Sequence, residues 1–418
     1  MYAMAPGHNA RYVSSFPAVS WCYQVPGAIE ASSSKLLSRT MVRDLVGFAI
    51  GVAVVDDTVF ATNDDGYLYA VNARTGELRW RFHAFNQLMG TPLVAKFDGR
   101  PLVFIGAGSS VFAYSHAVNF AEPDARVTRG NGLSAMFAVD ASTGELVWAF
   151  RTQGEDMPTP VLSKGRLLFG NGDGHVYSLD ATSGRLVWKS SIRSFVSMSS
   201  AALDPVSGVL VMGGTWPSRI YAVDAETGKR LWSVTPPEVF SSSAGDGTWA
   251  IHAHTAVGQI ETQDAQEAKT GAATSEELAL DLTSGHIVWS RQLGRGKVPP
   301  RNKDAVPTVD GDVIYTGSPV THCEYALDAS SGRILWKRRL DAGMKAAPSV
   351  VGDAVIQPAA NGDLITLDRS NGEIRHTLDL HQGGYGPQNG VVIGGTFFIG
   401  TNAGVLQAIP LRRLAVHQ

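Results

Sequence analysis

A short phrase that returns along the chain constrains the fold more than any other feature. Its first three copies read AVNARTGELRW at 70–80, AVDASTGELVW at 138–148 and SLDATSGRLVW at 178–188. The turn glycines of all the copies, the last one weaker, are Gly76, Gly144, Gly184, Gly228, Gly285, Gly332 and Gly372. Successive glycines are 68, 40, 44, 57, 47 and 40 residues apart, so the repeating unit has about 40 residues.

Each copy predicts a strand, a tight turn and a second strand. In the third copy Tyr177 and Leu179 alternate with the polar Ser178 and Asp180, which is the period of a strand. The Ser-Gly or Thr-Gly pair supplies the positive φ that a tight hairpin needs. Another hairpin precedes each copy, as in PSVVGDAVIQPAANGDLITLD at 348–368. Four short antiparallel strands in each unit indicate one blade of a β-propeller.

A tryptophan follows the turn glycine by four residues in six of the copies, and His376 takes this position in the seventh. These tryptophans are Trp80, Trp148, Trp188, Trp232, Trp289 and Trp336. A large flat side chain at one fixed position of every unit predicts a filler between neighbouring blades, where it buries much apolar area.

The end of the chain sets the number of blades. Residues 389–410 predict three strands without a tryptophan-bearing fourth, and SWCYQV at 20–25 has the character of that missing strand. We therefore expect an all-β, eight-bladed propeller of four-stranded antiparallel blades. It would be a single domain over 1–418 with its blades at about 47–410. The N-terminal strand would complete the last blade and leave no free sheet edge.

The pattern A-x-D-A-x-[TS]-G-x-x-x-W resembles the repeat of the quinoprotein-like propellers over about residues 20–410. This family includes the pyrroloquinoline-quinone (PQQ) alcohol dehydrogenases and the non-catalytic propeller of the outer-membrane assembly lipoprotein. The resemblance implies the fold, but the repeated residues are structural and imply no function. The dehydrogenases have a neighbouring cysteine pair, calcium ligands and a catalytic Asp. Here Cys22 and Cys323 fall in different blades and no block matches the calcium ligands, so the sequence disfavours PQQ as a cofactor.

Composition and patterning exclude several classes of protein. With 35 Lys+Arg against 38 Asp+Glu, the chain lacks the basic surface expected of a nucleic-acid binder. It has no apolar run long enough to predict a membrane span. The N-terminus has no basic segment followed by an apolar core, so as written the chain is expected to be cytoplasmic. If an export signal precedes this sequence, we expect a periplasmic protein.

The longest spacings place additions on one face of the ring. Insertions at 109–135 and 255–277 fall between second and third strands, and the long connection at 27–47 falls between blades. Both kinds of segment leave a blade on the same face, which we call the top. Because binding residues are often carried by loops on a rigid scaffold, we expect a site at the top of the central axis.

Residues at the start of each inner strand should ring that axis. They are Gln87, Met89, Asp156, Met157, Met198, Ser241, Lys303, Asp304, Lys345, Gln388 and Asn389. Asp156 and Lys345 are expected to face each other and to carry out acid–base catalysis, because buried charged groups have shifted pKa values. His83, Gln87, Asp304, His381, Gln388 and Asn389 are the candidate ligand-binding residues. The alternative is that these polar groups only bind water or pair with their neighbours.

The sharpest metal-binding candidate is the pair His252 and His254 in WAIHAHT. Residues two apart in a strand point the same way, so the pair could share a divalent metal with His322 or Glu261 as a third ligand. His252 is also a candidate catalytic residue. The alternative is two solvent-facing or hydrogen-bonded histidines at a strand end.

Two functions of different classes remain open at this stage. The favoured one is a small-molecule site at the top mouth, in an enzyme whose reaction and cofactor the sequence leaves unnamed. The other is a non-catalytic scaffold that binds a protein partner through its loops. No G-x-S-x-G, phosphate-binding loop, dinucleotide fingerprint or H-E-x-x-H motif occurs in the chain.

Overall fold

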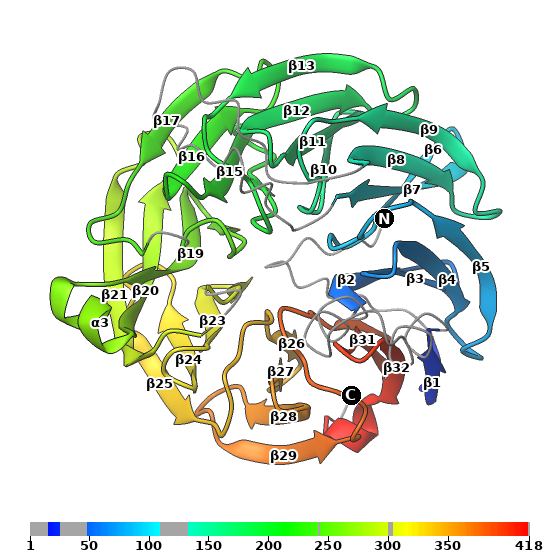
Figure 1. The fold of residues 1–418 in the computed structure, drawn as a ribbon. Coiled ribbons are helices and arrows are strands. Elements are labelled where there is room, and N and C mark those ends of the chain that lie inside the picture. The colour runs from blue at the N-terminus through cyan, green and yellow to red at the C-terminus, as the bar shows by residue number, and fades with distance from the viewer. Residues whose placement is uncertain (1–15, 26–47, 109–132, 241–242, 300–303, 417–418) are drawn as a thin grey trace.

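The computed structural model describes residues 16–25, 48–108, 133–240, 243–299 and 304–416. These residues form eight four-stranded antiparallel sheets arranged as blades around one axis (Figure 1). The predicted all-β, eight-bladed propeller is therefore confirmed. None of the helices in these ranges is long and apolar enough to cross a membrane.

The first four blades run in chain order. Blade 1 consists of β2 (Phe48–Val55), β3 (Thr58–Asn63), β4 (Tyr67–Asn72) and β5 (Leu78–His83). Blade 2 consists of β6 (Leu93–Phe97), β7 (Arg100–Ala107), β8 (Ala135–Asp140) and β9 (Leu146–Arg151). Blade 3 consists of β10 (Val161–Ser163), β11 (Arg166–Gly170), β12 (His175–Asp180) and β13 (Leu186–Ser191). Blade 4 consists of β14 (Ala202–Leu203), β15 (Val209–Gly214), β16 (Arg219–Asp224) and β17 (Arg230–Val234).

The other four blades complete the ring. Blade 5 consists of β18 (Ala250–His252), β19 (Thr255–Thr262), β20 (Ala272–Asp281) and β21 (Ile287–Lys297). Blade 6 consists of β22 (Thr308–Asp310), β23 (Val313–Ser318), β24 (Cys323–Asp328) and β25 (Ile334–Arg339). Blade 7 consists of β26 (Ser349–Val351), β27 (Ala354–Pro358), β28 (Asp363–Asp368) and β29 (Ile374–Asp379). Blade 8 consists of β30 (Val391–Ile393), β31 (Thr396–Gly400), β32 (Val405–Pro410) and β1 (Trp21–Gln24), followed by the 3-10 helix η2 (Leu411–Leu414).

The last blade joins the two ends of the described chain. β1 pairs antiparallel with β32, with Trp21 opposite Ala408. The indole Nε1 of Trp21 donates to the Ala73 carbonyl oxygen of blade 1 at 2.9 Å. The N-terminal strand therefore closes blade 8 and contacts blade 1, as predicted.

Each recurrent tryptophan packs on the turn glycine of the next blade. A Cβ atom at Gly144 would lie 2.7 Å from the Trp80 ring, and one at Gly228 would lie 2.5 Å from the Trp188 ring. Both glycines also have positive φ, 78° and 74°. A larger residue would therefore be strained and would displace the ring. The tryptophans fill the gaps between blades, as predicted.

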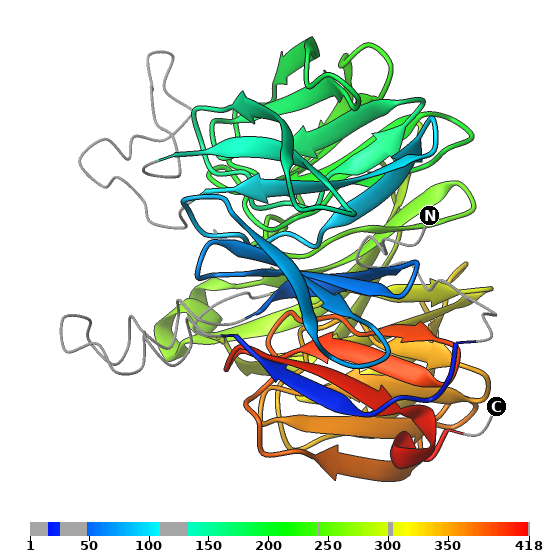
Figure 2. The same cartoon turned by 90° about the vertical axis from the view of Figure 1, so that its right-hand side faces the viewer.

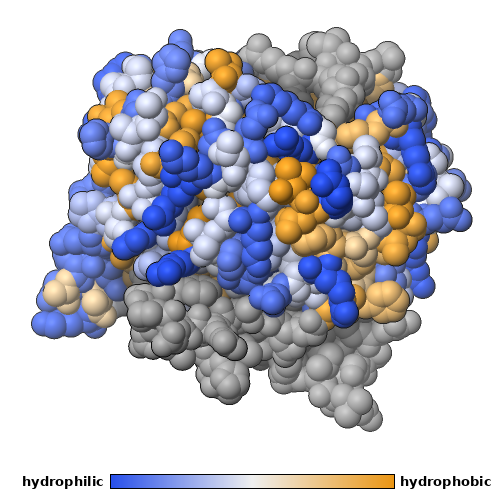
Figure 3. Space-filling view, turned by 90° about the horizontal axis from the view of Figure 1, so that it is seen from above, coloured by the Kyte–Doolittle hydropathy of each residue, from blue (hydrophilic) through white to orange (hydrophobic). Residues whose placement is uncertain are grey.

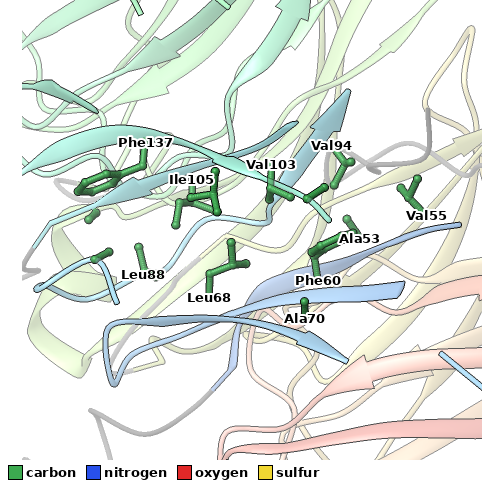
Figure 4. Close-up of a cluster of buried hydrophobic side chains, with 14 of the residues drawn as sticks. Ala53, Val55, Phe60, Leu68, Ala70, Leu88, Val94, Val103, Ile105 and Phe137 are labelled. Carbon is green, nitrogen blue, oxygen red and sulfur yellow. The ribbon is translucent and has the colours of Figure 1, made fainter. Parts of the chain in front are cut away.

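The hydrophobic core is divided among the interfaces between blades. Eight apolar clusters of the described residues each join two neighbouring blades, including blade 8 with blade 1. Figure 4 shows the cluster between blades 1 and 2, where Phe60 and Leu68 meet Val103, Ile105 and Phe137. Every blade is thus stabilised mainly by its two neighbours.

The segment 255–277, expected as an irregular insertion, is regular instead. β19 and β20 are longer than the equivalent strands of the other blades, and α3 (Ala265–Thr270) joins them. Figure 2 shows the ring edge-on, with α3 on its top side. Side-chain caps explain the helix: Asp264 accepts from the amides of Gln266 and Glu267, and Glu267 accepts from the Asp264 amide. Residues 109–132 of the other insertion and the whole connection 27–47 lie outside the described residues.

Candidate active site at the top of the axis

A belt of hydrogen bonds joins the connections between blades. The Thr91 amide donates to Thr159 Oγ1 and the Thr159 amide donates to Ser200 Oγ, both at 2.9 Å. The Ser200 amide donates to Thr248 Oγ1 at 3.2 Å. These residues occupy equivalent positions, two before the first residue of the inner strands of blades 2 to 5. Equivalent residues of adjacent blades can touch only near the axis, because blades diverge outward, so the belt marks the inner edge of the ring.

A second row of residues lies four residues before the inner strands of blades 2 to 7, which is two residues before the belt at blades 2 to 5. We call it the axial row, and it consists of Met89, Met157, Met198, Asp246, Asp304 and Lys345. The connections into blades 2, 3 and 4 supply its three thioethers, and those into blades 5, 6 and 7 supply its three charged groups. Met157, Met198 and Asp304 are buried, whereas Met89, Asp246 and Lys345 are partly exposed.

Asp304 is the most constrained carboxyl group of the row. Its Oδ1 accepts from Ser243 Oγ at 2.7 Å and its Oδ2 accepts from the Ala244 amide at 2.8 Å. Burial raises the pKa of Asp304 to about 7, and the nearby charge of Asp246 acts in the same direction. Asp304 can therefore gain or lose a proton near neutral pH while it holds the connection that carries Asp246.

Buried carboxyl groups continue behind the row, between blades 5 and 6. Burial raises the pKa of Glu277 to about 8. Burial also holds the pKa of Glu324 well above its usual range, and Glu277 adds to this shift. Gln259 connects this pair to the axial row, because its Oε1 accepts from the Ala305 amide at 3.2 Å and its Nε2 donates to Thr316 Oγ1 at 3.1 Å. Behind the charged residues of the axial row therefore lie two carboxyl groups, Glu277 and Glu324, whose raised pKa values favour the neutral form.

Asp156 and Lys345 were predicted to face each other. The connections that carry them lie on opposite sides of the ring, but the two side chains do not face each other. The connections into blades 3 and 7 are opposite in a ring of eight, but the Asp156 carboxyl is buried. It accepts from Asn171 Nδ2 at 2.6 Å and from Thr152 Oγ1. Asp156 thus organises the turns of blade 3, while Lys345 is partly exposed at the axis.

The structure does not assemble the predicted metal site. β18 ends at His252, and the next residue, Ala253, has φ of 49°. His252 and His254 therefore flank a turn and do not share a strand face. This turn lies on the bottom side, where the His254 carbonyl accepts from the Leu282 amide and His252 Nε2 lies 3.2 Å from Asp312 Oδ1. His322 lies in a top turn. Within the described ranges, no group of three His, Cys, Asp or Glu residues could hold a metal ion.

The remaining candidate histidines lie at the outside of the ring. His83 ends β5, the outermost strand of blade 1, and stacks on Tyr67 with ring centroids 4.4 Å apart. His381 follows β29 and forms an ion pair with Asp379 at 2.7 Å. Neither histidine belongs to the axial row. Figure 3 shows one side of the ring, where hydrophilic and hydrophobic residues alternate in small patches and form no large patch of either kind.

The candidates Gln87, Gln388 and Asn389 have structural contacts near the axis. The Gln87 carbonyl accepts from the Gly108 amide at 3.0 Å. Gln388 is buried and its Oε1 accepts from the Gly386 amide. Asn389 continues the belt, because its Oδ1 accepts from the Ala347 amide at 2.6 Å. Ser241 and Lys303 lie outside the described residues.

A comparison with protein families identifies the repeat. The model of the family described as outer membrane protein assembly factor BamB matches residues 24–117, 108–259 and 274–413. The chain belongs to this BamB family of PQQ-like propellers. The sequence resemblance is confirmed.

Two curated relatives of this BamB-family chain carry the name tetrathionate hydrolase. The protein from Acidithiobacillus ferrooxidans is 29% identical over 397 residues, which cover 93% of this chain and 76% of the relative. The protein from Acidianus ambivalens is 26% identical over 391 residues, which cover 88% of this chain and 72% of the relative. The similarity therefore runs through nearly all the blades.

Solved structures share the fold at low identity. BamB from Moraxella catarrhalis aligns with a TM-score of 0.60 and 18% identity over 86% of this chain and 95% of its own. The quinohemoprotein alcohol dehydrogenase from Comamonas testosteroni aligns with a TM-score of 0.63 and 13% identity over 96% of this chain and 78% of its own. At these identities the likeness shows the BamB-family fold alone.

Sequence reasoning missed one member of the axial row in this BamB-family propeller. The connection into blade 5 was represented by Ser241, whereas the row contains Asp246. Thr248 precedes the inner strand of blade 5 by two residues, as Thr91 and Thr159 precede those of blades 2 and 3. Counting two residues back from Thr248 finds Asp246.

Proposed function

We propose that this protein is a hydrolase of a small sulfur oxyanion, with tetrathionate as the first substrate to test, and that the axial row forms its active site. The observation that carries the proposal is the Asp246–Asp304 pair in the same row as Lys345. It occurs in a chain of which 93% aligns with a protein named tetrathionate hydrolase. A carboxyl group with a raised pKa, a second carboxyl group and a cation in one row are the groups that acid–base hydrolysis of an anion needs.

The chemistry assigns different tasks to the three residues. Tetrathionate is a dianion in which two sulfonate groups are joined through two further sulfur atoms. Hydrolysis adds water across an S–S bond, so one sulfur gains the hydroxyl and the other leaves with the bonding electrons and a proton. The Lys345 ammonium would attract a sulfonate end. The partly exposed Asp246 would take the proton from water, and Asp304 would position the Asp246 connection.

The test is turnover of tetrathionate by the purified chain, measured as loss of substrate by ion chromatography between pH 3 and pH 8. We expect Asp246→Asn to lower kcat by about 10²- to 10⁴-fold, the usual contribution of a general base. Lys345→Gln should mainly raise KM. His252→Ala, on the bottom side, is the matched control and should leave both constants unchanged.

The pH profile gives a further check of the same assignment. Because Asp304 is neutral below about pH 7, the site should bind a dianion better in acid and lose affinity as the pH rises through 7. Asp304→Asn should remove this step in KM while keeping a folded protein. A folded wild-type chain that leaves tetrathionate intact over the whole pH range would refute the proposed function.

A second candidate function is a non-catalytic scaffold that binds a protein partner. It is favoured by the description of the family, outer membrane protein assembly factor BamB. Recovery of one stoichiometric partner with the chain, together with absence of tetrathionate turnover, would support this candidate instead.

A further inference from the structure

The two halves of the axial row differ in chemistry. We propose that the thioether half, Met89, Met157 and Met198, is a subsite for the sulfur chain of a polythionate, while the charged half holds a sulfonate end. This inference rests on the proposed function, since it states how such a substrate would lie in the site. It also predicts that the enzyme discriminates between oxyanions by the length of their sulfur chain.

The three methionines form one cluster although they come from three different connections. Met157 and Met198 are 1% and 4% exposed and contact each other, and Met89 packs against them while remaining partly exposed. Equivalent residues of three successive blades can meet only near the axis. The cluster therefore presents Met89 at the inner edge of the ring, supported by the two buried methionines.

The charged half lies across the axis from this cluster. In a ring of eight blades, the connection into blade 7, which carries Lys345, is opposite the connection into blade 3, which carries Met157. By the same geometry, the connection into blade 6, which carries Asp304, is opposite the connection into blade 2, which carries Met89. A ligand at the top of the axis would therefore meet the Met89 thioether, backed by Met157 and Met198, on one side and Lys345 on the other.

This division matches the two parts of a polythionate. Its sulfonate ends are charged and suit the ammonium of Lys345. Its inner sulfur atoms are divalent, polarizable and weakly hydrated, so they gain dispersion energy against thioether sulfur and methyl groups. An oxyanion without inner sulfur atoms could use only the charged half.

The experiment compares two dianions that differ in this one part. Tetrathionate has two sulfur atoms between its sulfonates, whereas dithionate has its sulfonates bonded directly. Binding of each is measured by calorimetry at pH 5 in the full chain carrying Asp246→Asn, in which turnover is slow. Adding Met89→Ala should weaken tetrathionate binding about tenfold, the usual effect of lost apolar contact in a pocket. Dithionate binding should stay within about twofold on the same reasoning.

Two matched variants separate contact from general damage. Met89→Leu keeps the apolar bulk and should restore most of the tetrathionate affinity. Met344→Leu changes a fully buried methionine of the Lys345 connection that packs beside Gly317, and it should alter neither affinity. Thermal unfolding of each variant verifies that it is folded.

The outcomes distinguish this inference from the proposed function. Equal weakening of both dianions by Met89→Ala, or weakening of neither, overturns the sulfur-chain subsite while leaving the hydrolase in place. Binding of neither dianion by the parent protein, together with absence of turnover in the wild-type chain, overturns the proposed function and this inference together.

Discussion

At the scale of single residues, the ring depends on one contact that recurs at seven blade interfaces, a tryptophan ring against the turn glycine of the next blade. The contacts differ in one detail. The indole of Trp148 donates to the Ala181 carbonyl at 3.1 Å, whereas the buried Trp188 Nε1 has no partner among the described residues. The pair Trp148 and Trp188 therefore separates packing from hydrogen bonding.

We expect Trp188→Ala to destabilise the fold by about 3 kcal/mol, the lower end of the range for a large aromatic truncation, because the ring packs on Gly228 but is only partly buried. Trp148→Ala should cost about 1 kcal/mol more, the usual net worth of one hydrogen bond. Chemical denaturation of the two variants measures the difference. An equal loss in both would mean that the indole hydrogen bond contributes nothing, and an unchanged midpoint for Trp188→Ala would contradict its role between blades.

At the scale of elements, the long hairpin of blade 5 is the part that departs most from the repeat. Its helix α3 is short, so its stability depends on its caps. Asp264→Ala removes the side chain that accepts from the amides of Gln266 and Glu267 at 2.8 and 2.7 Å. We expect a loss of about 1 kcal/mol that stays local. Hydrogen exchange should rise over 265–270 alone. The control Gln266→Ala keeps the cap and should leave exchange unchanged.

The same element shows why parts of the structure could not be predicted. Turns with Ser-Gly or Thr-Gly reveal their position in the sequence, and from them the blades, the closing strand and the tryptophan contacts were predicted correctly. The turn after His252 has Ala253 at positive φ, so WAIHAHT carries no turn signal and its two histidines were wrongly expected to share one strand. Asp246 was missed because the connection into blade 5 is longer than those into blades 2 to 4 and 6 to 8. Side-chain directions, as at Asp156, need the packed structure.

At the scale of the whole molecule, the buried acids make stability depend on pH. Glu277 has its pKa raised to about 8 and Asp304 to about 7, whereas in the unfolded chain both titrate near 4. Between these values the folded protein holds protons that the unfolded chain has lost. These two groups should therefore make stability fall as the pH rises from about 4 to about 8.

Denaturation midpoints at pH 4, 6 and 8 measure this slope, which is roughly 1.4 kcal/mol per pH unit for each group within its window. Glu277→Gln should flatten it and raise stability at pH 8. Glu226→Gln, a change at an exposed ion pair with Lys164, should leave it unaltered. Equal stability of the wild-type chain at pH 4 and pH 8 would contradict the buried neutral acids.

The pairing of β1 with β32 also has a consequence for how the protein is made. Blades 1 to 7 are each encoded by one continuous stretch, so they can form as the chain leaves the ribosome. Blade 8 needs residues 21–24 and 405–408 together, and such a non-local pairing is slow to form. Until residues 405–408 have been made, the growing chain is an open row of blades whose first and last members each lack one neighbour. The pairing of β1 with β32 is therefore the step that turns a linear array into a ring.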